Sequence, residues 1–222
     1  MTEPLNIIYQ DDWLVAVDKP AGQLVHPADK PKDDDQVTMK ILRDQLGQHV
    51  YNIHRIDRPT TGVLLFGIDR DAARALHRAL ERHEVQKTYW AIVSGSPPAD
   101  AWECHVPLQK HDQAPEREAH TSFRVLEKST SLALIEATPH TGRTHQIRKH
   151  LLHAEIPIVG DYRYAGIDTS DHLGRQLGTG TRMLLQSRLL EFIHPVTAIN
   201  TAIKSPVDPC FSDCFPSLLK VT

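Results

Sequence analysis

The order of short apolar runs along the chain is the feature that most constrains its fold. Two runs, Leu5–Tyr9 and Trp13–Val17, are separated by the polar pair Asp11-Asp12, which is typical of a β-hairpin. Further strand-like runs fall at residues 63–68, 87–93, 122–126, 132–137, 183–185, 189–193 and 202–203. Because these runs do not alternate regularly with helices, we predict an α+β fold, a mostly antiparallel mixed β-sheet with flanking helices.

Apolar residues recur at helical spacing in three places. The predicted helices cover residues 37–46, a segment that begins at Asp69 or Asp71, and residues 144–154. Two long polar segments, 27–36 and 96–120, are predicted to be loops.

Length and composition indicate one globular domain. The chain has 222 residues, of which 40% are hydrophobic and 24% are charged. No apolar run approaches the roughly 20 residues that a membrane span needs. We expect no signal peptide, because the first residues contain no basic leader followed by an apolar stretch. Three cysteines at uneven spacing do not suggest a disulfide framework. We therefore expect a single catalytic domain over residues 1–222, monomeric and cytoplasmic, with no membrane association.

Net charge does not decide whether the partner is a nucleic acid. The formal charge is −3, so the strongly basic balance of many nucleic-acid binders is absent. Residues 1–35 hold eight acidic and three basic side chains, and the remaining residues hold 20 acidic and 22 basic. Only local clusters of charge can therefore indicate an RNA partner.

The first such cluster is His54-Arg55-Ile56-Asp57-Arg58, which leads through Pro59-Thr60-Thr61-Gly62 into an apolar strand. Two neighbouring guanidinium groups favour the ionised form of Asp57. An ionised carboxylate on a rigid loop suits attack on a sugar carbon or removal of a proton. Taken alone, the residues favour the simpler interpretation, an aspartate that closes an Asx-turn between solvated arginines.

The second cluster, residues 140–150, is a loop rich in cations that runs into a helix N-terminus, where exposed N–H groups favour phosphate. Arg148 lies beside the apolar stripe of this helix, and a buried arginine normally requires a carboxylate partner. Arg143 and Lys149 lie further round the helix and could meet backbone phosphates. A solvated basic helix face is the alternative.

A tyrosine on a predicted strand and a group of histidines and cysteines are two further candidates for a functional role. Tyr89 lies in the strand-like run Lys87–Val93 and alternates with Trp90, so one of the two aromatic rings faces the core; packing is the simple interpretation. The histidines at 140, 145, 150 and 153 do not share one helix face, and Cys210 and Cys214 have no second pair. We therefore expect no metal site.

Together these segments resemble the RluA family of RNA pseudouridine synthases. The resemblance rests on six elements in the family's order, namely Lys19–Gly22 with His26-Pro27, His54–Asp57 with Thr60–Gly62, Lys87–Tyr89, Thr141–Arg148, Pro157–Asp161 and His194-Pro195. Two residues depart mildly from the usual pattern, Ile56 for leucine and Thr61 for serine. The chain is expected to lack the small N-terminal RNA-binding module of some relatives.

The resemblance implies a catalytic set and a mechanism without a cofactor. Asp57 would be the essential carboxylate, which either attacks C1′ of the target uridine or removes its C2′ proton. Arg148 would pair with Asp57, and Tyr89 would pack on the uracil and act in removal of the C5 proton. Substrate-binding residues would be His54, Arg55, Lys19, Arg143, Thr144 and Lys149.

The sequence leaves the RNA substrate open. Gln23, the run 43–50 and Arg58-Pro59 look most like the branch of the family that modifies position 65 of tRNA. Large-subunit rRNA is the alternative substrate. A non-catalytic RNA-binding protein on the same scaffold is a second alternative. A glycosidase is a third, but it would need a second carboxylate beside the scissile bond; a metal-dependent hydrolase is the last.

Overall fold

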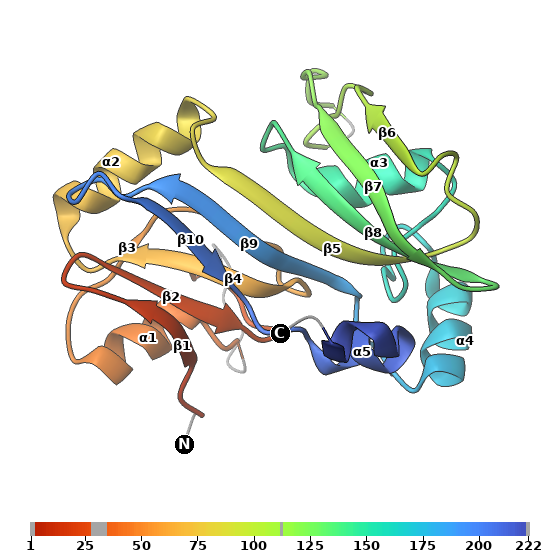
Figure 1. The fold of residues 1–222 in the computed structure, drawn as a ribbon, viewed down its shortest axis with the longest axis horizontal. Helices are drawn as coiled ribbons and strands as arrows, with labels where there is room; N and C mark the ends of the chain where they lie inside the picture. Colours follow the sequence, from red (N-terminus) through yellow and green to blue (C-terminus); the bar gives the residue numbers. More distant parts are fainter. Residues whose placement is uncertain (1–2, 28–34, 112, 221–222) are drawn as a thin grey trace. The chain divides into compact units, whose positions relative to one another are not determined.

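The computed structural model describes residues 3–27, 35–111 and 113–220 (Figure 1). This part of the chain contains ten β-strands and five α-helices. It divides into two compact units, residues 1–87 with 187–206 and residues 88–186 with 207–222. The single catalytic domain expected over residues 1–222 stays a prediction.

The first unit is built on antiparallel strands. Its strands are β1 (Asn6–Gln10), β2 (Leu14–Lys19), β3 (Tyr51–Asn52), β4 (Thr61–Gly67), β9 (Leu185–Ile193) and β10 (Asn200–Lys204). They follow in the order β1-β2-β4-β9, with β10 beside β9 and β3 beside β4. The first two form the predicted hairpin, in which Asn6 pairs with Asp18.

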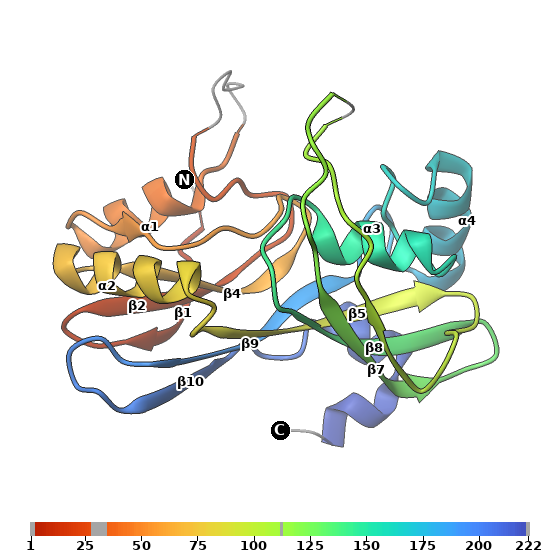
Figure 2. The same ribbon diagram turned by 90° about the horizontal axis from the view of Figure 1, so that it is seen from above.

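Two helices pack on one face of these strands (Figure 2). They are α1 (Thr38–Leu46) and α2 (Arg70–Glu81). The first ends at Gly47, whose left-handed backbone suits glycine. The second begins at Asp69, whose side chain accepts the N–H groups of Asp71 and Ala72. The predicted extent of α1 is thus confirmed to within one residue, and of the two predicted starts of α2 the structure has the one at Asp69.

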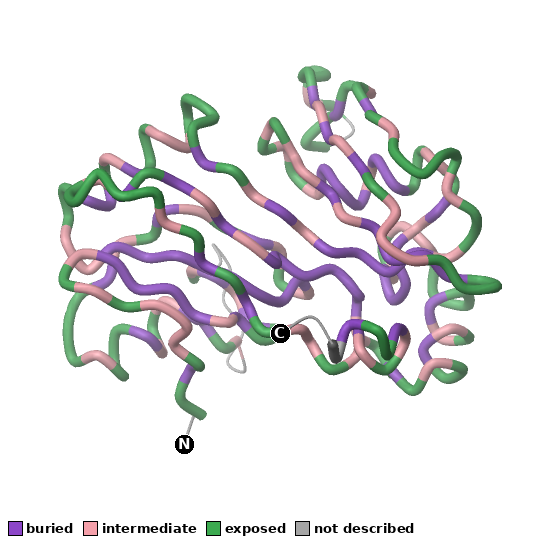
Figure 3. The backbone as a smooth tube through the Cα atoms, in the orientation of Figure 1, coloured by how far each residue is buried: buried purple, intermediate pink, exposed green. Residues whose placement is uncertain are grey.

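A hydrophobic core joins α2 to the strands of the first unit. It includes Leu76 of α2, Leu14 of β2, Leu65 of β4 and Leu190 of β9. Every residue of β4 is buried, as the purple tube of Figure 3 shows. This strand therefore gives a rigid support to the loop that precedes it.

The second unit carries strands in the order β5-β8-β7-β6. They are β5 (Gln86–Ser94), β6 (Ala101–Cys104), β7 (Thr121–Lys128) and β8 (Leu132–Pro139), and the pairs β5–β8, β8–β7 and β7–β6 are antiparallel. Its helices are α3 (Gln146–His153), α4 (Ile167–Leu177), α5 (Pro209–Cys214) and the 3₁₀-helix η1 (Pro216–Lys220).

The second unit has a core on both faces of β5. Ala91 and Val93 face a cluster that contains Ile147 and Leu151 of α3. Trp90 and Ile92 point the other way, into a cluster that contains Phe211 of α5. Alternate residues of a strand point to opposite faces, so this strand reads as a nearly continuous apolar run.

The structure corrects several expected boundaries. Residues 96–120 are not all loop, because Ala101–Cys104 form β6 and pair with β7. The helix expected at 144–154 begins at Gln146, since His145 has a left-handed φ of 56°. Strand runs expected at 183–185 and 189–193 belong largely to one strand, β9. Of the loop expected at 27–36, residues 28–34 lie outside the described residues.

The mixed sheet with its flanking helices confirms the predicted α+β class, and the pairs described above are antiparallel. Two helices, α4 and α5, were not predicted, because their few buried apolar positions make only a weak helical pattern. Among the described residues, no helix combines the length and the apolar character that crossing a membrane requires.

Gly62 offers a test of how β4 is packed. Its φ is +102°, and a Cβ placed on it would lie 2.2 Å from the carbonyl oxygen of Ser187. We expect Gly62→Ala to lower the free energy of unfolding by more than about 4 kcal/mol in urea denaturation, because backbone strain and a backbone clash add.

Gly22→Ala is the matched control. Gly22 also has a positive φ, +86°, but nothing lies within 4 Å of a Cβ placed there. Only strain remains, so we expect a loss of about 1–2 kcal/mol. Equal losses in the two variants would contradict the close approach of β4 and Ser187.

Candidate active site

Asp57 lies in an extended loop between two elements of the first unit, β3 and β4. The buried side chains of Ile53 and Ile56 anchor this loop in the unit, and Asp57 itself is half-buried. The N–H of Thr60 donates to the main-chain carbonyl of Asp57 at 3.0 Å, which closes the turn at Arg58-Pro59. The turn is thus closed through backbone atoms, as a rigid mount for the Asp57 side chain requires.

Lys19 fastens the Asp57 loop to the segment after β2. Its side chain is fully buried, and Nζ donates to the carbonyls of Pro20, Gln23 and Arg58 at 2.7, 3.0 and 3.1 Å. The N–H of Gly22 also donates to the carbonyl of Arg58, at 2.9 Å. Such burial is at odds with the phosphate contact expected for Lys19, because a phosphate would have to reach an amine that is shielded from solvent.

The two arginines beside Asp57 differ in their surroundings. Arg58 donates from Nε to the carbonyl of Gly22 at 2.7 Å, and its Nη1 lies 3.0 Å from the carboxylate of Asp35. Arg55 is exposed. Arg58 therefore acts within the protein, whereas the side chain of Arg55 is accessible, as its predicted RNA contact requires.

His54 braces the loop against β4. Its Nε2 accepts the backbone N–H of Leu65 at 3.0 Å. Burial, and secondarily the charge of Lys87, lowers the pKa of His54 to about 3, so the ring is neutral at pH 7. This hydrogen bond gives His54 a structural role, and its role in substrate binding stays a prediction.

In the second unit, Arg148 forms a buried ion pair with Asp161. Their side chains are 6% and 1% exposed, and Arg148 donates from Nε and Nη2 to the two carboxylate oxygens at 2.7 and 2.8 Å. The guanidinium also lies over the ring of Tyr164, 5.0 Å from its centroid. The carboxylate expected for a buried Arg148 is thus present, and it is that of Asp161.

A network around Gln146 shapes the loop that precedes α3. Gln146 Oε1 accepts from the hydroxyl of Thr141 at 2.7 Å and from the N–H of Arg143 at 3.0 Å. Its Nε2 donates to the carbonyl of His120 at 2.8 Å. One buried amide therefore holds the loop 141–145 against the start of β7.

Three predicted substrate-binding residues lie in this loop or in the helix that follows it. Thr144 is exposed. Arg143 donates from Nε to the carbonyl of Glu118 at 2.8 Å, and Lys149 donates to the carbonyl of Gln109 at 2.5 Å. Both cations thus hold the long segment before β7 in place, and their phosphate contacts stay predictions.

Tyr89 lies half-buried on β5, opposite Ala137 of β8. It packs against the cluster that includes Ala91, while Trp90 packs into the cluster on the other face. Both aromatic rings are therefore in contact with core residues, which corrects the expectation that only one of them would be.

The structure thus brings His54, Lys19 and Asp57 together in the first unit, and places Tyr89 and Arg148 in the second. The pairing of Arg148 with Asp57 stays a prediction.

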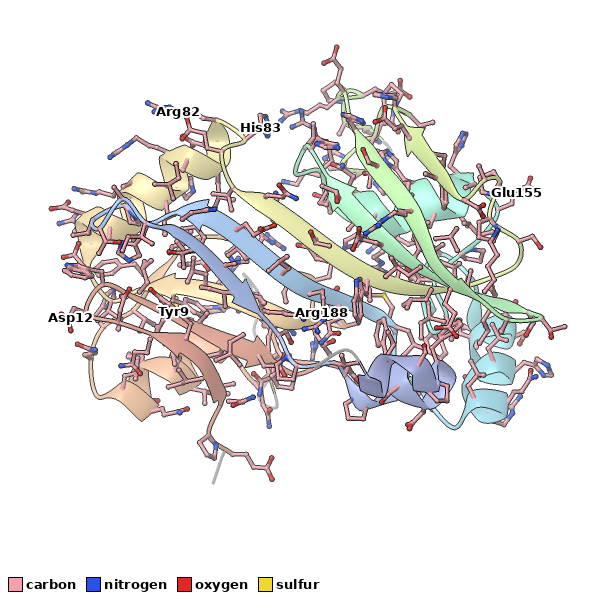
Figure 4. The ribbon with its side chains drawn as sticks, in the orientation of Figure 1. Tyr9, Asp12, Arg82, His83, Glu155 and Arg188 are labelled. Atoms are coloured by element: carbon pink, nitrogen blue, oxygen red, sulfur yellow. The ribbon has the colours of Figure 1, made fainter. Side chains whose placement is uncertain are left out.

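Sequence analysis missed two site candidates. In the sequence, Asp161 stands out only as the last residue of the run Pro157–Asp161. Arg188 of β9, labelled in Figure 4, is 4% exposed, and burial lowers its pKa while the charge of Asp18 opposes that effect. A lone arginine in an apolar strand was the available signal for the latter.

Comparisons with known proteins identify the family of this chain. Residues 13–153 match the family model of RNA pseudouridylate synthases. A protein of Pasteurella multocida named tRNA pseudouridine synthase C is 40% identical over 233 residues, covering 94% of each chain. This chain belongs to the RNA pseudouridylate synthase family.

Other relatives of this pseudouridine synthase give the same result. Proteins named tRNA pseudouridine synthase C from Salmonella typhimurium and Vibrio cholerae are 37% and 38% identical, each over 92% of this chain and 86% and 91% of their own. The solved structure of human RNA pseudouridylate synthase domain containing 4 superposes with a TM-score of 0.77 at 26% identity, covering 96% of this chain and 93% of that one. The family and fold that the sequence motifs indicated are confirmed.

The ion pair of this pseudouridine synthase can be tested by substitution. We expect Asp161→Asn to lower the free energy of unfolding by about 3–5 kcal/mol, because it removes the carboxylate that neutralises a buried guanidinium. Chemical denaturation measures the loss. Glu136→Gln, which breaks the exposed Arg124–Glu136 pair at 2.7 Å, is the control and should change stability by less than about 1 kcal/mol. Similar losses would argue against a structural role for the buried pair.

The lowered pKa of His54 predicts a pH dependence of folding. In the unfolded chain the ring has its ordinary pKa of 6.5, so between pH 6.5 and about 3 the unfolded state binds a proton that the folded state does not. Stability should therefore fall as the pH is lowered through this window, by about 1.4 kcal/mol per pH unit from this group.

Heteronuclear NMR of the ring measures the pKa of His54 directly. We expect no protonation of His54 at pH 5, and a modestly higher pKa in Lys87→Gln, because the charge of Lys87 is the smaller of the two causes. A midpoint near 6.5 in the folded protein would contradict the buried, hydrogen-bonded ring.

Proposed function

We propose that this pseudouridine synthase isomerises a specific uridine in tRNA, at the position 65 type of site. The observation that carries the substrate class is the 40% identity, over 94% of both chains, to a protein named tRNA pseudouridine synthase C. We further propose that the enzyme is cytoplasmic, which its free cysteines favour, and that it acts as a monomer.

Asp57 is the carboxylate that starts the reaction in this proposal. The N1–C1′ bond of uridine breaks, the uracil turns, and a C5–C1′ bond forms while the C5 proton is lost and N1 gains a proton. Asp57 either attacks C1′ or removes the C2′ proton to give a glycal. Both routes leave the overall oxidation state unchanged, so side chains alone suffice.

Arg148 orients Asp57 in this proposal. The pair with Asp161 uses the Nε and Nη2 groups of the guanidinium. Arginine carries five N–H donors in a rigid fork, so the guanidinium can bind a second carboxylate besides Asp161, and in this proposal that carboxylate is Asp57. Asp161 then acts as a positioning residue, since it sets the plane in which Arg148 meets Asp57.

Tyr89 contributes a ring face and a phenol in this proposal. The ring packs on the extruded uracil, and the phenol takes the C5 proton or relays it to another base. Extrusion of the base requires a few kcal/mol of unstacking energy, and the exposed planar cation of Arg55 fills the vacated space.

RNA affinity comes from a small number of exposed groups. The formal net charge is −3, and Lys19, Arg143 and Lys149 each donate to backbone carbonyls. Arg55 and Thr144 are exposed. Because only a few phosphates would be neutralised, the affinity for RNA should fall only gradually as the salt concentration rises.

The proposal is tested by mapping pseudouridine in total RNA from cells with and without the protein, and by release of the C5 hydrogen from labelled tRNA. We expect one tRNA site to lose its pseudouridine. Asp57→Asn should fold and bind tRNA but make no product, because an amide neither attacks C1′ nor accepts the proton.

Asp71→Asn, an exposed carboxylate on α2, is the control and should retain full activity. Turnover by Asp57→Asn would remove Asp57 from its role. Loss of pseudouridine at a large-subunit rRNA site instead of a tRNA site would overturn the substrate but keep the chemistry.

A further inference from the structure

One group of metal-ligand side chains lies outside the catalytic set, at the edge where β6 and β7 pair. It consists of Glu103 in β6, His105 just after β6, and His120 just before β7. One carboxylate oxygen, Oε2 of Glu103, lies 3.1 Å from Nε2 of His105 and 3.4 Å from Nε2 of His120. All three ligand atoms lie within 4.8 Å of one another.

These separations match those of ligands around a small metal ion. Zinc binds histidine nitrogen and carboxylate oxygen at about 2.0–2.2 Å, and tetrahedral angles then place neighbouring ligand atoms roughly 3.4 Å apart. The two separations from Glu103 Oε2 are close to that value. A cation can therefore enter with small side-chain rotations, which the exposure of His105 (63%) permits.

One ring nitrogen of this group is buried without a hydrogen bond in the part of the chain that the structure describes. Nε2 of His120 is shielded from solvent and has no hydrogen-bond partner among the described residues. The ring of His120 is stacked between His105 and His140, with centroids 4.1 and 4.2 Å apart. Stacking therefore fixes a ring whose buried nitrogen faces the carboxylate without a hydrogen bond.

Ser122 orients the carboxylate from the opposite side. Its hydroxyl donates to Oε1 of Glu103 at 3.2 Å and lies 2.7 Å from Nε2 of His140. Metal ligands in proteins are commonly oriented by such neighbouring hydrogen bonds.

We propose that Glu103, His105 and His120 bind a divalent transition-metal ion of the zinc class, with water completing the coordination. Two imidazole nitrogens with one carboxylate suit zinc or cobalt, whereas magnesium and calcium prefer oxygen ligands alone. The site takes no part in the isomerisation, because none of its residues belongs to the proposed catalytic set.

The ion would stabilise the loop before α3. The N–H of His140 donates to the carbonyl of His120 at 2.9 Å, and the N–H of His120 donates to the hydroxyl of Thr141 at 3.0 Å. A metal that holds His120 therefore also holds the loop that carries Arg143 and Thr144. This predicts a metal-dependent rise in thermal stability.

Binding is measured on the full chain, free of any affinity tag, by titration calorimetry with Zn²⁺ and by the visible spectrum with Co²⁺. We expect one ion per chain, the intense visible bands of four-coordinate cobalt, and a higher Tm. Loss of a group that only orients a ligand weakens metal binding by about 10–100-fold, so Glu103→Gln and His105→Ala, which remove ligands, should weaken it at least that much.

His77→Ala is the matched control, since it removes another exposed histidine beside a glutamate, Glu81 at 3.5 Å. It should leave the affinity and the metal-dependent Tm unchanged. Circular dichroism checks that each variant folds, and the exposed positions of Glu103 and His105 favour this. Absence of one-to-one binding, or equal binding by the Glu103 and His105 variants, would overturn the proposal. These readouts do not use catalytic activity, so they are independent of the proposed function.

Discussion

The buried pair between Arg148 and Asp161 is the interaction on which the arrangement of the candidate site depends most. Both charges are removed from water, so the pair is tolerated only because two short hydrogen bonds join them in one plane. Arg148 lies in α3. Asp161 follows a short segment in which Ile158 forms an antiparallel bridge with Val93 of β5. The pair therefore connects the helix to the sheet of the second unit at a defined orientation.

Several cations of this protein hold its own backbone. Lys19 donates to three carbonyls beside the Asp57 loop, and Arg143 and Lys149 tie the segment before β7 to α3. An acidic chain that works on RNA thus uses several of its cations to fix its own loops. In the proposed function, the rigidity of those loops, more than bulk charge, positions the groups that meet the substrate. The proposed metal at Glu103 would add to the same function at the edge of β6 and β7.

Much of the fold was predictable because local patterns agree with the tertiary structure. Asp11-Asp12 between two apolar runs predicted the hairpin, Gly47 predicted the end of α1, and Asp69 the start of α2. The strand β6 was missed because a short edge strand with one buried residue carries almost no apolar pattern. The predicted start of α3 at residue 144 is two residues too early, since nothing in the sequence marks His145 as a left-handed residue before the helix.

The sequence by itself determined the family and the identities of the candidate catalytic residues, because the motifs around Asp57, Tyr89 and Arg148 are local and ordered along the chain. Only the tertiary structure decided the partners of the buried polar side chains in the candidate site. Arg148 pairs with Asp161, His54 accepts the N–H of Leu65, and Lys19 donates to three carbonyls. The physical reason is burial. A charge or a ring nitrogen taken out of water must find a partner in space, and residues far apart in the sequence supply it.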